Sequence, residues 1–508
     1  MYTPSRSEFE ALAKEHNLIP IYREIIADTD TPVSAFLKLG DKVNSFLLES
    51  VIGGDQLGRY SFLGNDPFLV ITAQENRVFI EGKESTLLEG VDDPLKIVEE
   101  HIKAYNPAII EGLPPFFGGA VGYVGYDAIR YFERIPKNAA DDLGIPEMVF
   151  LFTDIVIIFD HIKHKIKVVA NVRVDGSDAS KLYSQAVEKI DMVIKKLRGS
   201  SDHIQLLELA QHNAREFSSN VSKDQFTEMV ERAKQYIHDG DIFQVVLSQR
   251  FSTPVSMPPF DIYRVLRTIN PSPYMIYLKL NNCTIAGASP EPLIQVQDGI
   301  VTTRPIAGTR PRGKDAQEEA ELELELLADE KERAEHVMLV DLGRNDIGRV
   351  CEAGTVKVDN LMYVERYSHV MHIVSTVSGK LAKGKNSFDA LRAAFPAGTV
   401  SGAPKIRAME IIDELEPTLR GPYAGVYGYF GFNGTLDCGI TIRTIVIKDG
   451  QAYVQAGAGI VADSIPEREF IETKNKAKAL FAAIDQASYA EVDGSSTGHK
   501  VSSMNLLT

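Results

Sequence analysis

The sequence of 508 residues contains no tryptophan and only three cysteines, Cys283, Cys351 and Cys438, which lie far apart along the chain. Three scattered cysteines provide neither a disulfide framework nor a zinc-binding cluster, so we expect a reducing, cytoplasmic environment. No apolar run approaches the roughly 20 residues that cross a bilayer, and no apolar leader follows a basic start. We therefore expect no membrane partner.

Positive charge is also in deficit, because 54 lysines and arginines face 70 aspartates and glutamates, for a net charge of −16. This balance argues against nucleic acid and anionic membranes as partners. The 44% hydrophobic and 24% charged content is typical of a folded globular protein, with room for one composite domain or two to three ordinary ones. An anionic substrate would need local positive charge from arginine, lysine, a metal ion or helix N-termini.

A polar, irregular stretch at about 200–221 marks the boundary that we expect within the chain. We expect an N-terminal subdomain over 1–210, a second subdomain over 211–490 and a flexible tail over 491–508. Apolar alternation with Asn-Gly or Gly-Asp turns predicts hairpins in both subdomains, including one over 35–50.

Two segments share one pattern, because GGAVGYVGYD at 118–127 and AGVYGYFGFN at 424–433 have three glycines and a tyrosine at equal spacing. This likeness favours an old internal duplication. We also expect two long buried strands over 147–172 and a single last sheet over 425–462. Only the second subdomain carries the acidic pairs described next, so we expect the chemistry to lie there.

The segment 321–346 consists mostly of strong helix formers and predicts one long helix. On this helix Glu332, Glu335 and His336 fall on one side. The apolar side, which we expect to face the core, lies roughly opposite and contains Leu327, Ala334, Val337 and Met338. Two carboxylates three residues apart repel each other, and this pair alone favours a solvated helix face.

A second pair, Glu469 and Glu472, has the same spacing in a helix for which Ser464 and Glu467 form a capping-box signature. Two helices that each present such a pair could together bind one hard cation through oxygen. Mg²⁺ suits a few carboxylates combined with waters and substrate, so the two pairs predict a Mg²⁺ site.

Four other features each leave two interpretations open. Arg443 lies in an apolar strand, where a buried guanidinium needs a carboxylate from a ligand or from a structural salt bridge. His372, on an apolar strand, is a core histidine by default and a general base otherwise. Glu291 is a solvated turn residue or an acid of raised pKa in a metal site. The loop at 397–407 leads into a helix N-terminus that suits an anion, or into an ordinary helix capped by Ser401.

Five motifs occur together: GASPE (287–291), RPIAGTRPRG (304–313), KERAEHVMLVDLGRND (331–346), GTVSGAPKIRA (398–408) and ETKNKAKAL (472–480). With these motifs the sequence resembles the anthranilate synthase component I family of chorismate-utilising enzymes, from LLES to about residue 485. The resemblance implies an α+β fold in which two large antiparallel β-sheets are sandwiched between outer helices. It also implies that chorismate, a dianion, binds in a cleft of the second, catalytic subdomain and that the first subdomain is regulatory.

The resemblance assigns a role to each matching residue. The Mg²⁺-associated acids would be Glu332, Glu335, Glu469 and Glu472. The substrate contacts would be Thr399, Tyr423, Arg443, Gly457 and Gly459. Glu291 would protonate the departing C4 hydroxyl of chorismate, and His372 would lie near the later elimination of pyruvate. The implied reaction adds ammonia at C2 and then eliminates pyruvate to give anthranilate, the first committed step of tryptophan biosynthesis.

Two positions distinguish relatives on this fold. Relatives that add water usually carry lysine where this sequence has Gln244, and those that aminate C4 usually carry lysine where it has Ala307. An amide is no base toward water and alanine is no nucleophile, so both positions favour ammonia at C2. None of the cysteines lies in a nucleophile-elbow context. A separate glutamine amidotransferase subunit is therefore implied, in a heterotetramer of two large and two small subunits.

The resemblance further implies feedback inhibition by tryptophan. The inhibitor residues would be Glu49 and Ser50 of LLES together with Pro273, Tyr274 and Met275 of NPSPYM. The alternative is that both segments are simply hairpin and turn sequence. An alternative for the whole chain is an inactive regulatory module that binds chorismate or an amino acid. Its intact acids, with His372 and Arg443, weigh against this alternative.

Overall fold

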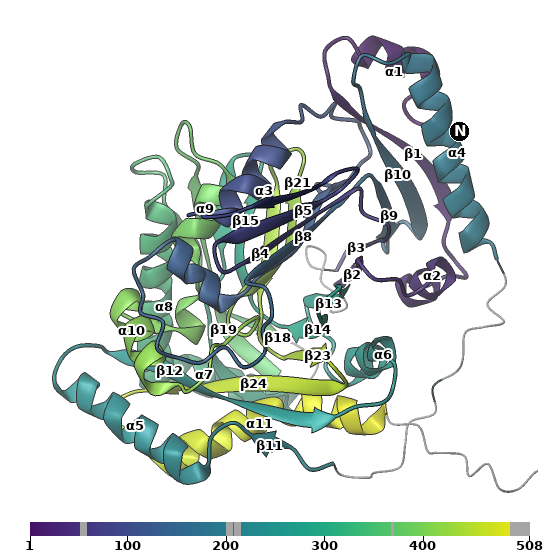
Figure 1. The fold of residues 1–508 in the computed structure, drawn as a ribbon. Coiled ribbons are helices and arrows are strands. Elements are labelled where there is room, and N and C mark those ends of the chain that lie inside the picture. Colours follow the sequence, from purple (N-terminus) through teal and green to yellow (C-terminus); the bar gives the residue numbers. More distant parts are fainter. Residues whose placement is uncertain (51–57, 200–206, 208–214, 367–369, 488–508) are drawn as a thin grey trace, which may run out of the picture.

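The computed structural model describes residues 1–50, 58–199, 207, 215–366 and 370–487. Within them the chain forms an α+β fold built on two 12-stranded antiparallel β-sheets with helices outside them (Figure 1), which confirms the expected fold class. None of the helices in this described part is both long enough and apolar enough to cross a membrane.

Both sheets take strands from both halves of the chain. Sheet A contains, in spatial order, β1 (Leu18–Ile26), β10 (Lys165–Arg173), β9 (Ile155–Asp160), β3 (Tyr60–Gly64), β2 (Ser45–Glu49), β13 (Tyr274–Lys279), β14 (Thr284–Ser289), β23 (Thr444–Lys448), β24 (Gln451–Ile460), β12 (Gln244–Pro254) and β11 (Ser218–Ser219), with β20 (Gly402–Ala403) on β12. Sheet B contains β17 (Ile306–Pro311), β19 (Val370–Lys380), β16 (Ile300–Thr303), β15 (Pro292–Gln297), β22 (Leu436–Ile440), β21 (Val426–Gly431), β7 (Gly119–Val124), β8 (Met148–Thr153), β4 (Leu69–Gln74), β5 (Arg77–Glu81) and β6 (Ser85–Leu88), with β18 (Lys357–Arg366) on β19. The division at residue 210 stays a prediction, and both sheets run across it. The expected tail over 491–508 lies outside the described residues.

Helices cover the outer faces of the sheets, and apolar side chains such as Phe46, Leu151 and Ile276 fill the space between them. On sheet A pack α1 (Arg6–Leu12), α2 (Pro32–Leu39), α4 (Ala179–Leu197), α6 (Pro259–Ile269) and α11 (Pro466–Gln486). On sheet B pack α3 (Pro94–Lys103), α7 (Ala316–Ala328), α8 (Glu330–Gly348) and α9 (Ser387–Ala394). At β12 lie α5 (Lys223–His238) and α10 (Lys405–Leu415), and two short 3₁₀ turns are η1 (Tyr126–Tyr131) and η2 (Gly398–Val400).

The two repeated segments are neighbours in space. Strands β7 and β21 pair antiparallel, with Gly122 opposite Gly428. A Cβ atom on Gly122 would lie 1.9 Å from the carbonyl oxygen of Val149, and one on Gly428 would lie 2.1 Å from that of Asp437. The shared glycines are therefore required by close backbone approach, and the duplication itself stays a hypothesis.

Three expected β segments differ in the structure. The first part of 35–50 belongs to helix α2, whose N-cap is Thr31, and only its second part is a strand. The stretch 147–172 forms three strands, because the chain crosses from sheet B to sheet A at Asp154. The strands over 425–462, expected to form a single last sheet, are likewise divided between sheet B and sheet A. Strands buried on both faces give no periodicity by which such a crossing could be recognised.

The expected helix over 321–346 is two helices, α7 and α8, which meet at Asp329. Asp329 accepts hydrogen bonds from the backbone N–H groups of Lys331 and Glu332, at 3.0 and 3.1 Å. An aspartate is a strong N-cap, and this local bond competes with a continuous helix. Helix α8 therefore begins at Glu330, and Glu332 lies in its first turn.

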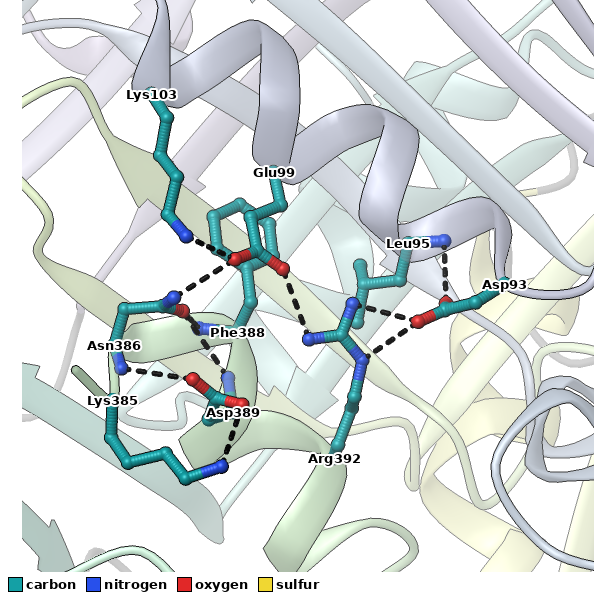
Figure 2. A network of polar contacts seen from close by, with 9 residues as sticks. All are labelled: Asp93, Leu95, Glu99, Lys103, Lys385, Asn386, Phe388, Asp389 and Arg392. Atoms are coloured by element: carbon teal, nitrogen blue, oxygen red, sulfur yellow. Dashed lines mark hydrogen bonds and ion pairs between the residues drawn. The ribbon is translucent and has the colours of Figure 1, made fainter.

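A polar network joins the two halves of the chain at helices α3 and α9 (Figure 2). Arg392 of α9 forms ion pairs with Asp93, the N-cap of α3, at 2.9 Å and with Glu99 at 3.1 Å. Asn386, the N-cap of α9, donates to Glu99 at 2.9 Å. The network fixes α9 on its outer side, and α9 leads directly into the loop that carries Thr399.

Candidate active site

A cavity of about 530 Å³ opens in the second half of the chain. Every residue to which a catalytic, substrate or metal role was assigned lines this cavity: Gln244, Glu291, Glu332, Glu335, His372, Thr399, Tyr423, Arg443, Gly457, Gly459, Glu469 and Glu472. Strands of both sheets and helices α8 and α11 contribute them. The structure thus brings the whole predicted set together, and their individual roles stay predictions.

The acidic pair of α8 faces inward, which reverses the expected orientation of this helix. Glu332 and Glu335 are half-buried at the cavity, whereas Val337, placed on the core side by the sequence, is 44% exposed. His336 lies in the core, where its Nε2 is 2.6 Å from Ser375 Oγ and burial lowers its pKa to about 4. The solvated-face interpretation is therefore wrong for this pair.

The second pair approaches the same cavity from α11. Burial and the neighbouring Glu472 raise the pKa of Glu469, and burial and Glu332 raise that of Glu335. Helix α11 begins at Pro466 with Ile465 as N-cap, so the expected capping box is wrong. The Oγ atom of Ser464 instead accepts from the backbone N–H of Val461 at 3.1 Å.

The donor chemistry of the cavity fits a hard cation. Four carboxylates from two helices line one cavity, and a cation bound there would oppose the burial and the neighbouring charge that raise the pKa of Glu335 and Glu469. Among the described side chains, however, no group of three acids, histidines or cysteines lies close enough to hold a metal ion. An ion bound here would need oxygen atoms from water or substrate as well, which is usual for Mg²⁺.

Glu291 directly precedes β15 and shares a hydrogen bond with Thr399. The Thr399 hydroxyl donates to Glu291 Oε1 at 2.9 Å. Burial raises the pKa of Glu291 to about 8, although the bond from Thr399 acts in the opposite direction. This burial argues against a solvated turn residue, and the raised pKa favours the protonated form of Glu291 at neutral pH.

Arg443 supplies positive charge at the point where the chain crosses between sheets. It lies between β22 and β23 at a φ of 50°, so its expected place within a strand is wrong. Its side chain is half-buried, and the guanidinium donates to the carbonyl oxygen of Lys476. Among the described side chains it has no ion-pair partner, which favours a ligand carboxylate over a structural salt bridge.

Two glycines of β24 leave room for polar side chains at the cavity wall. A Cβ atom on Gly457 would lie 2.8 Å from Tyr423 Oη, and one on Gly459 would lie 2.6 Å from Gln244 Nε2. Burial raises the pKa of Tyr423 to about 12, so its hydroxyl remains a donor. The glycines are needed because the backbone and these two side chains approach so closely.

His372 lies on β19 at the cavity, and the default interpretation as a core histidine is wrong. Its Nδ1 is 2.9 Å from the carbonyl oxygen of Gly308, which can only accept, so Nδ1 carries the proton. Burial lowers the pKa of His372, and the neutral ring then has its lone pair on Nε2. Ala307 of β17 lines the same cavity.

The loop at 397–407 does not end in the expected helix cap. Ser401 closes the 3₁₀ turn η2, and its hydroxyl donates to the carbonyl oxygen of Ala397 at 2.8 Å. Helix α10 begins at Lys405 with Pro404 as N-cap and no side-chain cap. A short strand, β20, separates the turn from the helix, so Thr399 reaches the cavity from the loop itself.

A second cavity of about 680 Å³ contains all five predicted inhibitor residues: Glu49, Ser50, Pro273, Tyr274 and Met275. Glu49 is not an open acceptor, because Arg267 pairs with it at 3.0 Å and the Tyr263 hydroxyl donates to it at 2.7 Å. Ser50 Oγ is buried without a hydrogen-bond partner among the described residues. Water or a ligand in the cavity could form a hydrogen bond with this hydroxyl.

Two polar residues that line these cavities, Lys476 and Asp437, were not identified from the sequence. Lys476 lines the first cavity, where it pairs with Glu472 at 2.7 Å and donates to the carbonyl oxygen of Gly457 at 3.1 Å. Asp437 lines the second cavity and accepts from the Tyr274 hydroxyl at 2.8 Å. The spacing of Lys476 four residues after Glu472 could have indicated the first, whereas no local signal marks the second.

Comparison with known proteins identifies the class of enzyme to which this fold belongs, the chorismate-binding enzymes. The model of the chorismate binding enzyme family matches residues 45–482. Anthranilate synthase component 1 of Acetivibrio thermocellus is 52% identical over 491 residues, which are 96% of this chain and 99% of that protein. The protein of the same name from Aquifex aeolicus is 46% identical and covers 95% of this chain and 98% of its own length.

Solved structures agree with these relatives. Anthranilate synthase component I from Streptococcus pneumoniae has a TM-score of 0.76 at 41% identity and covers 90% of this chain and 99% of its own. The menaquinone-specific isochorismate synthase MenF from Escherichia coli has a TM-score of 0.69 at 20% identity, covering 94% and 99%, which shows the shared fold alone. The chain belongs to the chorismate-binding enzyme family and, within it, to the anthranilate synthase component 1 group.

Proposed function

We propose that this protein converts chorismate to anthranilate, by adding ammonia at C2 with loss of the C4 hydroxyl and then eliminating pyruvate. One observation carries the proposal: a protonated acid, an unpaired arginine and an uncharged amide line one cavity. These are Glu291, Arg443 and Gln244. The amide stands where relatives that add water usually carry lysine, so it favours ammonia as the nucleophile.

Glu291 acts as the general acid in the first step. Its proton passes to the C4 hydroxyl, which leaves as water while ammonia bonds to C2 and both ring double bonds shift. The ammonium group formed at C2 then loses a proton to solvent. Thr399 keeps the carboxyl group in place through its hydrogen bond. In the second step the C2 proton and the enolpyruvyl ether are lost, which yields pyruvate and an aromatic ring, and neutral His372 assists this elimination.

Arg443 and Tyr423 bind a substrate carboxylate, with backbone of Gly457 and Gly459 beside it. Glu332, Glu335, Glu469 and Glu472 would hold Mg²⁺. When bound, the ion would offset the charge of these carboxylates and polarise a substrate carboxylate.

A partner must supply ammonia if glutamine is the source. Burial raises the pKa of the Cys283 thiol to about 12 and raises the pKa of Cys351 and Cys438 as well. All three are buried and protonated, so none is a nucleophile for glutamine. We infer a separate glutamine amidotransferase subunit, two of each chain in the assembly, and a cytoplasmic location.

The purified chain should make anthranilate from chorismate, Mg²⁺ and an ammonium salt, but not from chorismate, Mg²⁺ and glutamine. Anthranilate fluorescence measures the product directly. Adding the amidotransferase subunit should restore turnover with glutamine. Isochorismate or 4-amino-4-deoxychorismate as the main product would contradict the proposal.

We further propose that tryptophan binds the second cavity and inhibits the enzyme. The ligand offers an ammonium, a carboxylate and an indole, and the cavity offers Ser50, Tyr274 and apolar walls. Strand β2 of the first half pairs there with β13 of the second. A ligand between these strands would bias how the halves pack, and so compete with chorismate through conformation.

Ser50→Phe should weaken tryptophan inhibition by about tenfold or more, because the larger side chain fills space that the ligand needs. Uninhibited turnover should stay unchanged, as it should for the control Ser7→Phe on the exposed part of α1. Since the protein has no tryptophan of its own, selectively excited indole emission reports the bound ligand. Saturating tryptophan that alters neither activity nor emission would rule out the site.

A further inference from the structure

Two buried ion pairs lie behind the cavity, and no catalytic step uses them. Lys405 of α10 pairs with Asp346 of α8 at 2.8 Å, and each side chain is only 12% exposed. Arg420 pairs with Glu416 at 2.6 Å, and both are almost fully buried. A buried ion pair stabilises little compared with apolar side chains of equal volume, so stability alone does not explain two of them.

Each cation also donates to a main-chain carbonyl that flanks Thr399. Lys405 Nζ donates to the carbonyl oxygen of Ala394, the last residue of α9, at 2.9 Å. Arg420 Nη1 donates to the carbonyl oxygen of Val400 at 2.7 Å. The carbonyls at the end of a helix lack intrahelical partners, and the ammonium satisfies one of them here.

The segment between these two anchors, 394–400, is pressed against α8. A Cβ atom on Gly398 would lie 2.0 Å from Leu342 Cδ2. A small cavity of about 40 Å³ lies beneath the segment and is lined by Glu291, Thr399 and Asp346 together with Gly343 and Ala394. Asp346 of the ion pair and the catalytic acid therefore line the same small cavity beneath one tightly packed loop.

We propose that Lys405 and Asp346 are positioning residues that hold Thr399 against Glu291. Lys405 fixes the chain before Thr399, and Arg420 fixes it after. Asp346 holds the ammonium in place and ties the loop to α8, the helix that carries Glu332 and Glu335. The proposal rests on the proposed function, because it gives the pair a part in the acid step.

The test replaces the pair by apolar residues of similar size, Asp346→Leu with Lys405→Met. Packing is kept and no charge is left unpaired, so the variant should fold, with an unfolding temperature close to that of the wild type. The anchor on Ala394 is lost. The ammonia-dependent kcat should then fall by about 10- to 100-fold, with the KM for chorismate changed much less.

The pH profile separates positioning from a general loss of structure. The bond from Thr399 lowers the pKa of Glu291, so its loss raises that pKa further. The alkaline limb of the kcat profile should move to higher pH in the pair variant and in Thr399→Val alike. Combining the two changes should add little, because both remove the same hydrogen bond.

The matched control is Arg407→Gln, two residues along the same helix. Arg407 pairs with Asp241 and Glu410 at the surface, and it should affect neither kcat nor the pH profile. If the apolar pair does not fold, Asp346→Asn with Lys405→Met keeps the shape of the aspartate side chain and leaves no charge unpaired, and it should show the same fall and the same shift. A folded variant with wild-type kcat and pH profile overturns the proposal.

A crystal structure of the variant provides a readout that does not depend on activity. The distance from Thr399 Oγ1 to Glu291 Oε1, 2.9 Å in the wild type, should lengthen in the variant. If it stays the same, the positioning role fails. Failure of the wild type to make anthranilate would instead overturn the proposed function and leave this distance to decide the role of the pair.

Discussion

Glu291→Gln is expected to lower turnover by about a hundred- to ten-thousand-fold, the usual contribution of a general acid. Glutamine keeps the shape of the side chain and can still accept the hydrogen bond from Thr399. What it lacks is the proton, which in the wild type is present at neutral pH because burial raises the pKa of Glu291 to about 8. The loss should therefore appear in kcat, with chorismate binding largely kept.

The pH dependence has a definite sign. The acid form is required, so wild-type kcat should fall as pH rises through about 8, and this limb should vanish in Glu291→Gln. The folded pKa lies above the ordinary glutamate value of about 4.5, so the stability contributed by the protonated acid is complete below that pH and is lost as pH rises through about 8. At pH above 8 the variant should therefore unfold at a higher temperature than the wild type.

The control for this change is Glu352→Gln, which removes a half-buried carboxylate that pairs with Lys380 near the surface. It should leave kcat and its pH profile unchanged. Near-normal turnover of Glu291→Gln at pH 7 would show that another group protonates the leaving hydroxyl. The residual activity of the variant, measured with ammonium, decides between these outcomes.

The sequence predicted which residues form the site better than it predicted how the helices that carry them are oriented. The resemblance assigned roles to twelve residues, and one cavity brings all of them together. The inward side of α8 was predicted wrongly, since hydrophobic periodicity identifies the core side and a catalytic cavity reverses that relation. Glu332 and Glu335 face the cavity, and Val337, which was expected in the core, is exposed.

The path of the chain between the sheets could not be predicted. Arg443 sits at a crossing from sheet B to sheet A with a φ of 50°, yet the residues on both sides are apolar and read as one strand. Asp154 marks a similar crossing after β8. Strands that are buried on both faces look alike in either sheet, so only tertiary packing determines where such a chain crosses over.

Removing one carboxylate from either acidic pair should strongly weaken Mg²⁺ binding at this site and so lower turnover. Glu335→Gln or Glu472→Gln keeps the side-chain shape but removes a charge that would attract Mg²⁺. The Mg²⁺ concentration needed for half-maximal turnover should rise by about 10- to 100-fold or more, and turnover at ordinary Mg²⁺ should collapse. Glu330→Gln and Glu467→Gln, exposed on the same two helices, are the matched controls and should behave as the wild type.

Thermal unfolding tests the same idea without relying on turnover. Burial and neighbouring carboxylates raise the pKa of Glu335, which means that the ionised form of Glu335 is destabilised in the folded protein when no metal ion is bound. Without Mg²⁺, Glu335→Gln should therefore unfold at a temperature equal to or above that of the wild type. Added Mg²⁺ should raise the unfolding temperature of the wild type more than that of the variant, because only an ion that binds the folded state stabilises it. If Mg²⁺ raises the unfolding temperature of both proteins equally and the substitution does not affect turnover, the four carboxylates do not bind Mg²⁺.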